Sequence, residues 1–153
     1  MSDPAHKPRL YPLAWLLMAM LVICALDRWL PVAGLLPPPF HRFGLLIMLP
    51  GILILLHSGA SFIKAKTGLL PFSEATTLVT GGLYRFTRNP MYLGMVLFLL
   101  GVAVYLGSLS ALIPVAAFAW VIDRQFIRNE EIFLTGIFGD EFREYMKRVR
   151  RWI

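Results

Sequence analysis

Charge is scarce in this sequence, and cysteine is almost absent. Only 16% of the 153 residues are Asp, Glu, Lys or Arg, whereas 58% are hydrophobic; an average soluble domain carries about 25% charged residues. The one cysteine, Cys24, excludes an intramolecular disulfide. The length suffices for one domain. A chain so poor in charge is typical of a membrane protein.

Charged residues are missing from three long stretches, residues 11–26, 43–62 and 91–122. About 20 apolar residues are needed to cross a bilayer core. The first stretch has no small-x-small cleavage site before Asp27, so we interpret it as a retained anchor rather than a signal peptide. We predict an all-α polytopic membrane protein with about four transmembrane helices, near residues 10–30, 43–62, 90–107 and 109–126.

Basic residues are distributed unevenly between the predicted loops. The loop after the first span and the start of the second hold only Arg28 and Arg42. The other side carries His6, Lys7, Arg9, Lys64, Lys66, Arg85, Arg88, Arg124, Arg128, Arg143, Lys147, Arg148, Arg150 and Arg151. The positive-inside rule therefore places both termini and the 63–89 loop in the cytoplasm. We attribute the net charge of +6 to orientation and to the lipid bilayer, not to a nucleic-acid partner.

The last segment, "DEFREYMKRVRRWI", alternates apolar and basic residues at helical spacing. One face carries Phe142, Tyr145, Met146, Val149 and Trp152, and the other carries the basic residues. This pattern predicts a C-terminal interfacial amphipathic helix that lies on an anionic leaflet.

The stretch "YRFTRNPMYLG", residues 84–94, admits two interpretations. As a helix start it has Asn89 as N-cap and Pro90 in the first turn, with Tyr84 and Tyr92 in the headgroup zone. As a site it offers a helix N-terminus that attracts anions and tyrosine faces that can hold a sulfonium or ammonium cation. The residues alone favour the helix start without excluding the site.

Two adjacent carboxylates, Glu130 and Glu131, lie in the apolar surroundings of "RNEEIF". Carboxylates at membrane depth are costly, so they are usually functional or paired. Arg124, Arg128 and Glu131 share one helix face, since they lie four and three residues apart. A salt-bridged helix end and a functional site are equally compatible with this pattern.

Two segments that a short hairpin separates together resemble the isoprenylcysteine carboxyl methyltransferase family. They are "LVTGGLYRFTRNPMYLG" and "RNEEIFLTGIFGDEFREYMKRVRRWI". These integral membrane enzymes use S-adenosylmethionine and are related to the phospholipid N-methyltransferases. The resemblance covers about residues 60–152. It implies a single methyltransferase-like domain, residues 1–153, with an N-terminal helical pair at 10–62 and a cofactor-binding and catalytic half at 63–153.

The resemblance also implies roles for individual residues. The family's cofactor contacts fall on Thr76, Thr77, Leu78, Val79, Tyr84, Asn89, Pro90, Met91, Tyr92 and Glu130. Arg128, or next Arg124, would orient the methyl acceptor, and Glu131 would balance charge or accept a proton. Asn89 stands where many members have histidine, and asparagine cannot titrate near neutral pH.

We therefore expect methyl transfer from S-adenosylmethionine to a lipophilic acceptor, a carboxylate or an amine, at the cytoplasmic face of a prokaryotic inner membrane. Two alternatives remain: an NADPH-dependent enzyme like the membrane sterol reductases, for which the chain is small, and a non-catalytic scaffold, which Asn89 leaves open. We expect no metal, since His41 and His57 lack ligand spacing. The sequence carries no signal for oligomeric state.

Overall fold

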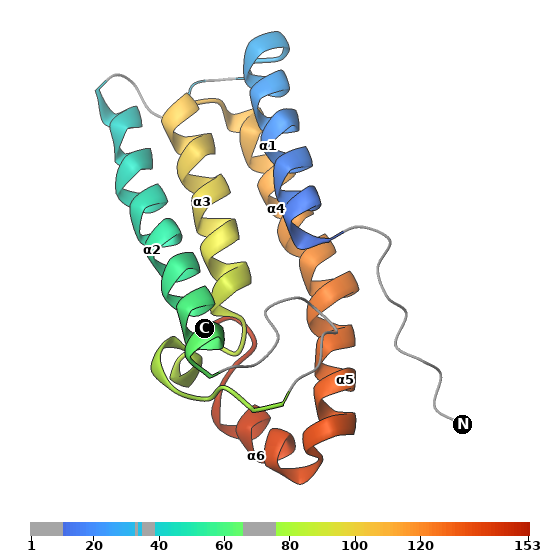
Figure 1. The fold of residues 1–153 in the computed structure, drawn as a ribbon. Coiled ribbons are helices and arrows are strands. Elements are labelled where there is room, and N and C mark those ends of the chain that lie inside the picture. Colours follow the sequence, from blue (N-terminus) through green and yellow to red (C-terminus); the bar gives the residue numbers. More distant parts are fainter. Residues whose placement is uncertain (1–10, 33, 35–38, 66–75) are drawn as a thin grey trace.

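The computed structural model describes residues 11–32, 34, 39–65 and 76–153. His6, Lys7, Arg9 and Lys66, part of the basic set, lie outside the described residues. The α-helices are α1 Pro12–Trp29, α2 Phe43–Lys64, α3 Pro90–Leu106, α4 Leu112–Val121, α5 Arg128–Phe138 and α6 Asp140–Arg148. A π-helical turn, Ile122–Ile127, joins α4 to α5, so these two form one long rod (Figure 1).

Helical segments of membrane-spanning length confirm the predicted all-α polytopic membrane protein. The helical segments that are long and apolar enough to cross a bilayer are Pro12–Trp29, Phe40–Lys64 and Leu109–Phe138. Helix α3 is a shorter apolar helix beside them. The predicted helix ends agree within a few residues. The helix of the last span continues beyond residue 126 to Phe138 and ends at Gly139, as the sequence of residues 123–139 predicts.

Glycines bring α2 and α3 into close contact along their length (Figure 1). A methyl group at Gly51 would lie 2.7 Å from the amide nitrogen of Phe98, and one at Gly94 would lie 2.7 Å from the carbonyl oxygen of Gly51. Gly44 and Gly101 repeat this arrangement seven residues away, about two turns along each helix. Small residues that let helix backbones approach are the usual means of packing helices in membranes.

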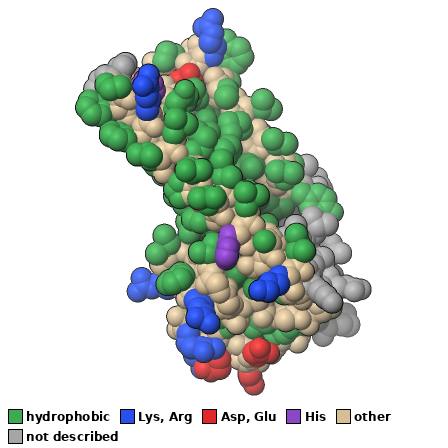
Figure 2. All heavy atoms as spheres, turned by 60° about the vertical axis from the view of Figure 1, so that its left-hand side comes forward, with side chains coloured by type: hydrophobic (Ala, Val, Ile, Leu, Met, Phe, Trp, Pro, Cys, Tyr) green, Lys and Arg blue, Asp and Glu red, His purple; other side chains and the backbone are tan. Residues whose placement is uncertain are grey.

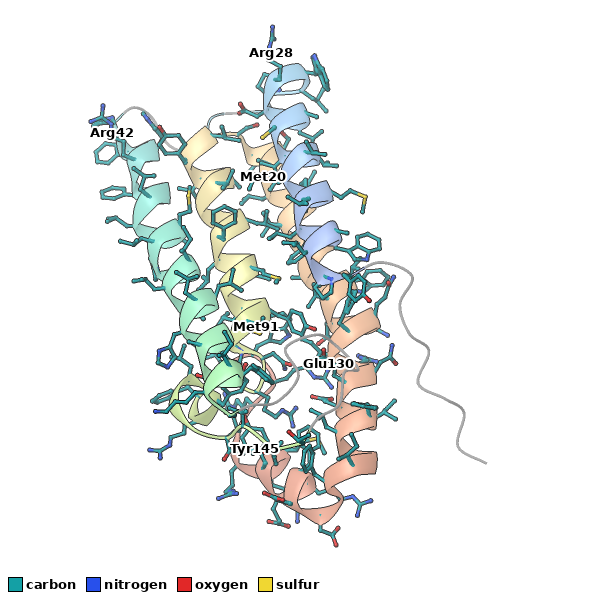
Figure 3. The ribbon with its side chains drawn as sticks, viewed as in Figure 1. Met20, Arg28, Arg42, Met91, Glu130 and Tyr145 are labelled. Atoms are coloured by element: carbon teal, nitrogen blue, oxygen red, sulfur yellow. The ribbon has the colours of Figure 1, made fainter. Side chains whose placement is uncertain are left out.

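The opposite ends of the molecule differ in character. At one end Gly107, with φ of 81°, closes α3, and the Ser110 hydroxyl donates to the carbonyl of Leu30 at 2.9 Å, which ties the α3–α4 hairpin to α1. Arg28 and Arg42 lie at this end, whereas Glu130 and Tyr145 lie toward the other (Figure 3). Hydrophobic side chains cover much of one face, and charged groups gather toward its α6 end (Figure 2).

The amphipathic helix α6 is present, but its apolar face packs on the protein itself. Phe142, Tyr145 and Val149 are buried. They pack with Leu78, Leu134, Phe138 and Met146. The prediction that this face lies on lipid is therefore wrong, because the 76–79 segment and α5 already cover it. The helix ends at Arg148, and residues 149–153, here called the C-terminal strap, continue without helical structure.

Candidate active site

The predicted cofactor segment leads into a short 3₁₀ turn, Gly82–Arg85, which buries Tyr84. The Tyr84 ring meets Phe62 of α2 edge-on, with centroids 5.6 Å apart. The backbone carbonyl oxygen of Tyr84 accepts a 2.6 Å hydrogen bond from the Tyr145 hydroxyl. Burial raises the pKa of Tyr84 above its ordinary value and raises the pKa of Tyr145 to about 12. Both phenols therefore stay protonated at neutral pH.

The residues just before this turn lie at the surface of the same end. Thr76 and Thr77 are exposed, whereas Leu78 and Val79 are half-buried. Leu78 packs with the buried face of α6, so the structure brings the segment into contact with the C-terminal part of the chain. Met91, also half-buried, lies at a similar level of the molecule to Glu130 (Figure 3).

Pro90 opens α3 as predicted, but Asn89 does not cap the helix with its side chain. Instead the Asn89 amide Nδ2 donates to the carbonyl of Arg151 at 3.0 Å, and its backbone N–H donates to the Thr87 hydroxyl at 3.2 Å. The capping prediction is wrong because the strap supplies an acceptor that the side-chain amide can reach. Asn89 therefore links the start of α3 to the C-terminus.

The contact between Tyr92 and Glu130 joins the two predicted halves of the site. The Tyr92 hydroxyl donates to Glu130 Oε1 at 2.8 Å, although the residues lie 38 positions apart. Tyr92 is buried, and the centroid of its ring lies 6.4 Å from the centroid of the Phe126 ring. A hydrogen bond to a carboxylate is strengthened where few polar groups and little water surround it. Two residues that the resemblance assigns to the cofactor site from separate segments therefore lie in direct contact.

Glu131 is held by two arginines. Oε1 lies 2.8 Å from Arg88 Nη2 and accepts from Arg151 Nε at 3.1 Å, while Oε2 accepts from Arg151 Nη2 at 2.6 Å. Arg151 Nη1 also donates to Asp123 at 3.2 Å. The hydrogen bond to Glu131 is the largest cause that raises the pKa of Arg151. Both carboxylate oxygens of Glu131 are thus engaged by guanidinium groups, and its predicted role, to balance charge or to accept a proton, stays a prediction.

Arg124 and Arg128, the arginines expected near the acceptor, are exposed. Arg128 pairs with Asp123 at 3.3 Å. Within the described part of the chain, no hydrogen bond or ion pair links either arginine to Glu130 or Glu131. Their role stays a prediction, and the guanidinium groups that reach Glu131 come from Arg88 and Arg151.

Two features of the site were not predicted from the sequence. Arg151 was assigned to lipid headgroups, because a basic tail residue offers no sequence cue for a partner 20 positions away. The π-helical turn Ile122–Ile127 has no composition cue either. Such turns are rare and occur often at functional sites. The described residues contain no group of three His, Cys, Asp or Glu side chains that could hold a metal ion.

The fold defines a polytopic membrane protein, and this polar cluster is a candidate site at one end of its helices. The family model for phospholipid methyltransferases matches residues 40–141, from just before α2 into the start of α6. The chain belongs to the phospholipid methyltransferase family.

Individual relatives agree with the resemblance to isoprenylcysteine methyltransferases. Protein-S-isoprenylcysteine O-methyltransferase of Schizosaccharomyces pombe is 35% identical over 72 residues, which are 47% of this chain and 30% of that protein. Protein-S-isoprenylcysteine O-methyltransferase A of Arabidopsis thaliana is 33% identical over 112 residues, 71% of this chain and 56% of that protein. An uncharacterized protein of Haemophilus influenzae is 43% identical over 63 residues, 41% of this chain and 100% of its own length.

The chain thus spans about a third to just over half the length of the two named methyltransferases. No solved structure matches the chain.

Proposed function

We propose that this protein transfers a methyl group from S-adenosylmethionine to a lipophilic acceptor, a carboxylate or an amine, at the cytoplasmic face of the membrane. The observation that carries the proposal is the Tyr92–Glu130 hydrogen bond, which brings together the two segments that resemble the family's cofactor motifs. Family membership and the methyltransferase names of the relatives support it.

The described residues fit this cofactor by the chemistry of their groups. Arg88 Nε is buried and has no hydrogen-bond partner within the described residues, so a donor suited to a carboxylate is available. Tyr84 and Tyr92 supply aromatic rings beside the cluster, and ring faces attract a positive sulfonium. The hydrogen bond to Tyr92 engages only one of the two carboxylate oxygens of Glu130. Asn89 and Pro90 fix the start of α3, and Thr76, Thr77, Leu78, Val79 and Met91 would complete the pocket.

Bound S-adenosylmethionine would supply an electrophilic methyl group on its sulfonium sulfur. The protein's part is to hold donor and acceptor in line and to keep water out. A carboxylate acceptor is already anionic and needs no base, whereas an amine must first lose a proton. We propose that the acceptor enters from the bilayer between α3 and α4, where the exposed Arg124 and Arg128 would meet its polar end.

The cytoplasmic assignment rests on the charge at each end. The α6 end carries exposed Arg85, Arg124, Arg143 and Lys147, while Arg28 and Arg42 lie at the other end (Figure 3). Because cytoplasmic loops are enriched in Lys and Arg, this distribution supports a cytoplasmic site.

Transfer of a labelled methyl group tests the proposal. Purified protein is incubated with methyl-labelled S-adenosylmethionine and a membrane lipid extract, and the products are identified by mass spectrometry. We expect label in a lipophilic methyl ester or methylamine, and none with the Glu130→Ala variant. Binding of NADPH rather than S-adenosylhomocysteine would favour a reductase, and failure to bind either would favour a non-catalytic scaffold.

A further inference from the structure

The C-terminal strap, residues 149–153, connects both halves of the candidate site. We propose that Arg151 is a positioning residue that aligns the start of α3 with α5, and so sets the geometry of the Tyr92–Glu130 pair. This inference rests on the proposed function, since it assigns Arg151 a role in that same site.

The backbone of the strap fastens the start of α3. The carbonyl of Arg151 accepts hydrogen bonds from the Thr87 hydroxyl at 3.1 Å and from Asn89 Nδ2 at 3.0 Å. The carbonyl of Arg150 accepts the backbone N–H of Arg88 at 2.9 Å. Three consecutive residues, 87 to 89, are thus bound to the strap directly before α3, and Tyr92 follows in the first turn of that helix.

The side chain of Arg151 fastens the other half. Its Nε and Nη2 donate to the two oxygens of Glu131, and its Nη1 donates to Asp123. A planar guanidinium suits this double engagement, which an ammonium group cannot reproduce. Glu131 is the sequence neighbour of Glu130, so fixing Glu131 also fixes the rotation of α5 that directs Glu130 toward Tyr92.

The π-helical turn explains how one guanidinium can reach both acidic residues. Asp123 and Glu131 lie eight positions apart, and in a regular α-helix they would differ by about 80° around the axis. The wider turn at Ile122–Ile127 takes up an extra residue. The two carboxylates then come close to one face, as residues seven apart do in a regular helix, and Arg151 spans them.

The strap packs against the rest of the protein. Val149 is buried, and Trp152 packs against the main core beside the helices. The side chain of Arg151 is 30% exposed, against 59% for Arg143 and 71% for Lys147. Arg151 therefore differs from the basic residues of α6, whose side chains are exposed and, among the described residues, bond within α6.

The test compares Arg151→Ala and Arg151→Lys with Arg148→Ala in the full chain in detergent. Arg148 is a matched control, because it is exposed and, within the described part of the chain, its Nε donates to the carbonyl of Glu144 in the same helix. The first measurement is hydrogen–deuterium exchange of peptides covering residues 86–92, which needs no cofactor. The second is the affinity for S-adenosylhomocysteine by calorimetry.

We expect Arg151→Ala to speed exchange in 86–92 and to weaken S-adenosylhomocysteine binding roughly tenfold or more, as loss of charge-assisted hydrogen bonds implies. Arg151→Lys should show a smaller change in the same direction, and it decides the outcome if Arg151→Ala does not fold. Glu131→Gln combined with Arg151→Ala should weaken binding by less than the product of the two single effects, because both changes remove the Glu131–Arg151 contact.

The proposal is overturned if Arg151→Ala matches Arg148→Ala in exchange and in affinity. It is also overturned if the effects of Glu131→Gln and Arg151→Ala multiply in full. If the unaltered protein binds no S-adenosylhomocysteine, the proposed function fails instead, and the exchange measurement still decides whether the strap holds residues 86–92.

Discussion

The hydroxyl of Tyr92 donates a 2.8 Å hydrogen bond to Oε1 of Glu130, and this contact joins the first turn of α3 to α5. The two residues come from segments that a hairpin separates in the sequence. A buried phenol and a carboxylate held together at the polar end of a membrane bundle are costly unless paired. Their pairing therefore contributes both to stability and to the proposed cofactor site.

Tyr92→Phe should destabilise the fold by about 2 kcal/mol, because it removes a hydrogen bond to a carboxylate but keeps the ring. Unfolding in detergent with increasing denaturant measures the change. Tyr105→Phe is the control, since Tyr105 is 42% exposed near the opposite end of α3. Equal stability of the two variants would show that the Tyr92 hydroxyl adds nothing to the fold.

Gly51→Ala should cost about 1–3 kcal/mol, because its methyl group would collide with the backbone of α3 at Phe98 and Gly94. Gly59→Ala in the same helix has nothing within 4 Å of the added methyl group. It should be neutral or slightly stabilising, since alanine favours helix over glycine. The same unfolding experiment compares them. A neutral Gly51→Ala would refute the close approach of α2 and α3.

Asn89→Ser separates helix capping from contact with the strap. Serine is a good N-cap residue, so it would preserve stability if capping were the role of Asn89. In the structure the side chain instead donates to the Arg151 carbonyl, a bond that serine is too short to reproduce. We therefore expect Asn89→Ser to lose about as much stability as Asn89→Ala, on the order of 1 kcal/mol. Full stability of Asn89→Ser with a clear loss in Asn89→Ala would restore the capping role.

Cysteine labelling tests the orientation of the bundle. In a Cys24→Ala background, Asp140→Cys should react with a membrane-impermeant reagent from the cytoplasmic face, and Leu109→Cys from the opposite face. Both positions are exposed, at the start of α6 and in the α3–α4 hairpin. Reaction of both cysteines from one face would contradict the spanning arrangement of α3 and α4.

Much of the fold follows from the sequence, because a bilayer demands long uncharged stretches. The expected 43–62 and 90–107 correspond to α2 Phe43–Lys64 and α3 Pro90–Leu106. The resemblance to a family assigned Tyr92 and Glu130 to one cofactor site, but the hydrogen bond between them was not predicted. Local pattern alone favoured a plain helix start at Asn89.

The contacts of the strap could not be predicted, because the partners of Arg151 lie between 20 and 64 positions away. A basic tail residue looks the same in sequence whether it binds lipid headgroups or a half-buried carboxylate. Arg151 was therefore predicted to contact lipid headgroups, although it pairs with Glu131. The side chain of Asn89 could likewise have bonded to the helix end or to a carbonyl 62 positions away. The sequence does not distinguish these two partners, whereas the structure shows the second.

Calorimetric titration with S-adenosylhomocysteine tests the central claim most directly. The unaltered protein should bind it, Glu130→Ala should show no detectable binding, and Glu141→Ala should bind like the unaltered protein. Glu141 is the matched control because it is an exposed glutamate on α6. If Glu130→Ala binds S-adenosylhomocysteine as tightly as the unaltered protein does, the site does not lie at Tyr92 and Glu130.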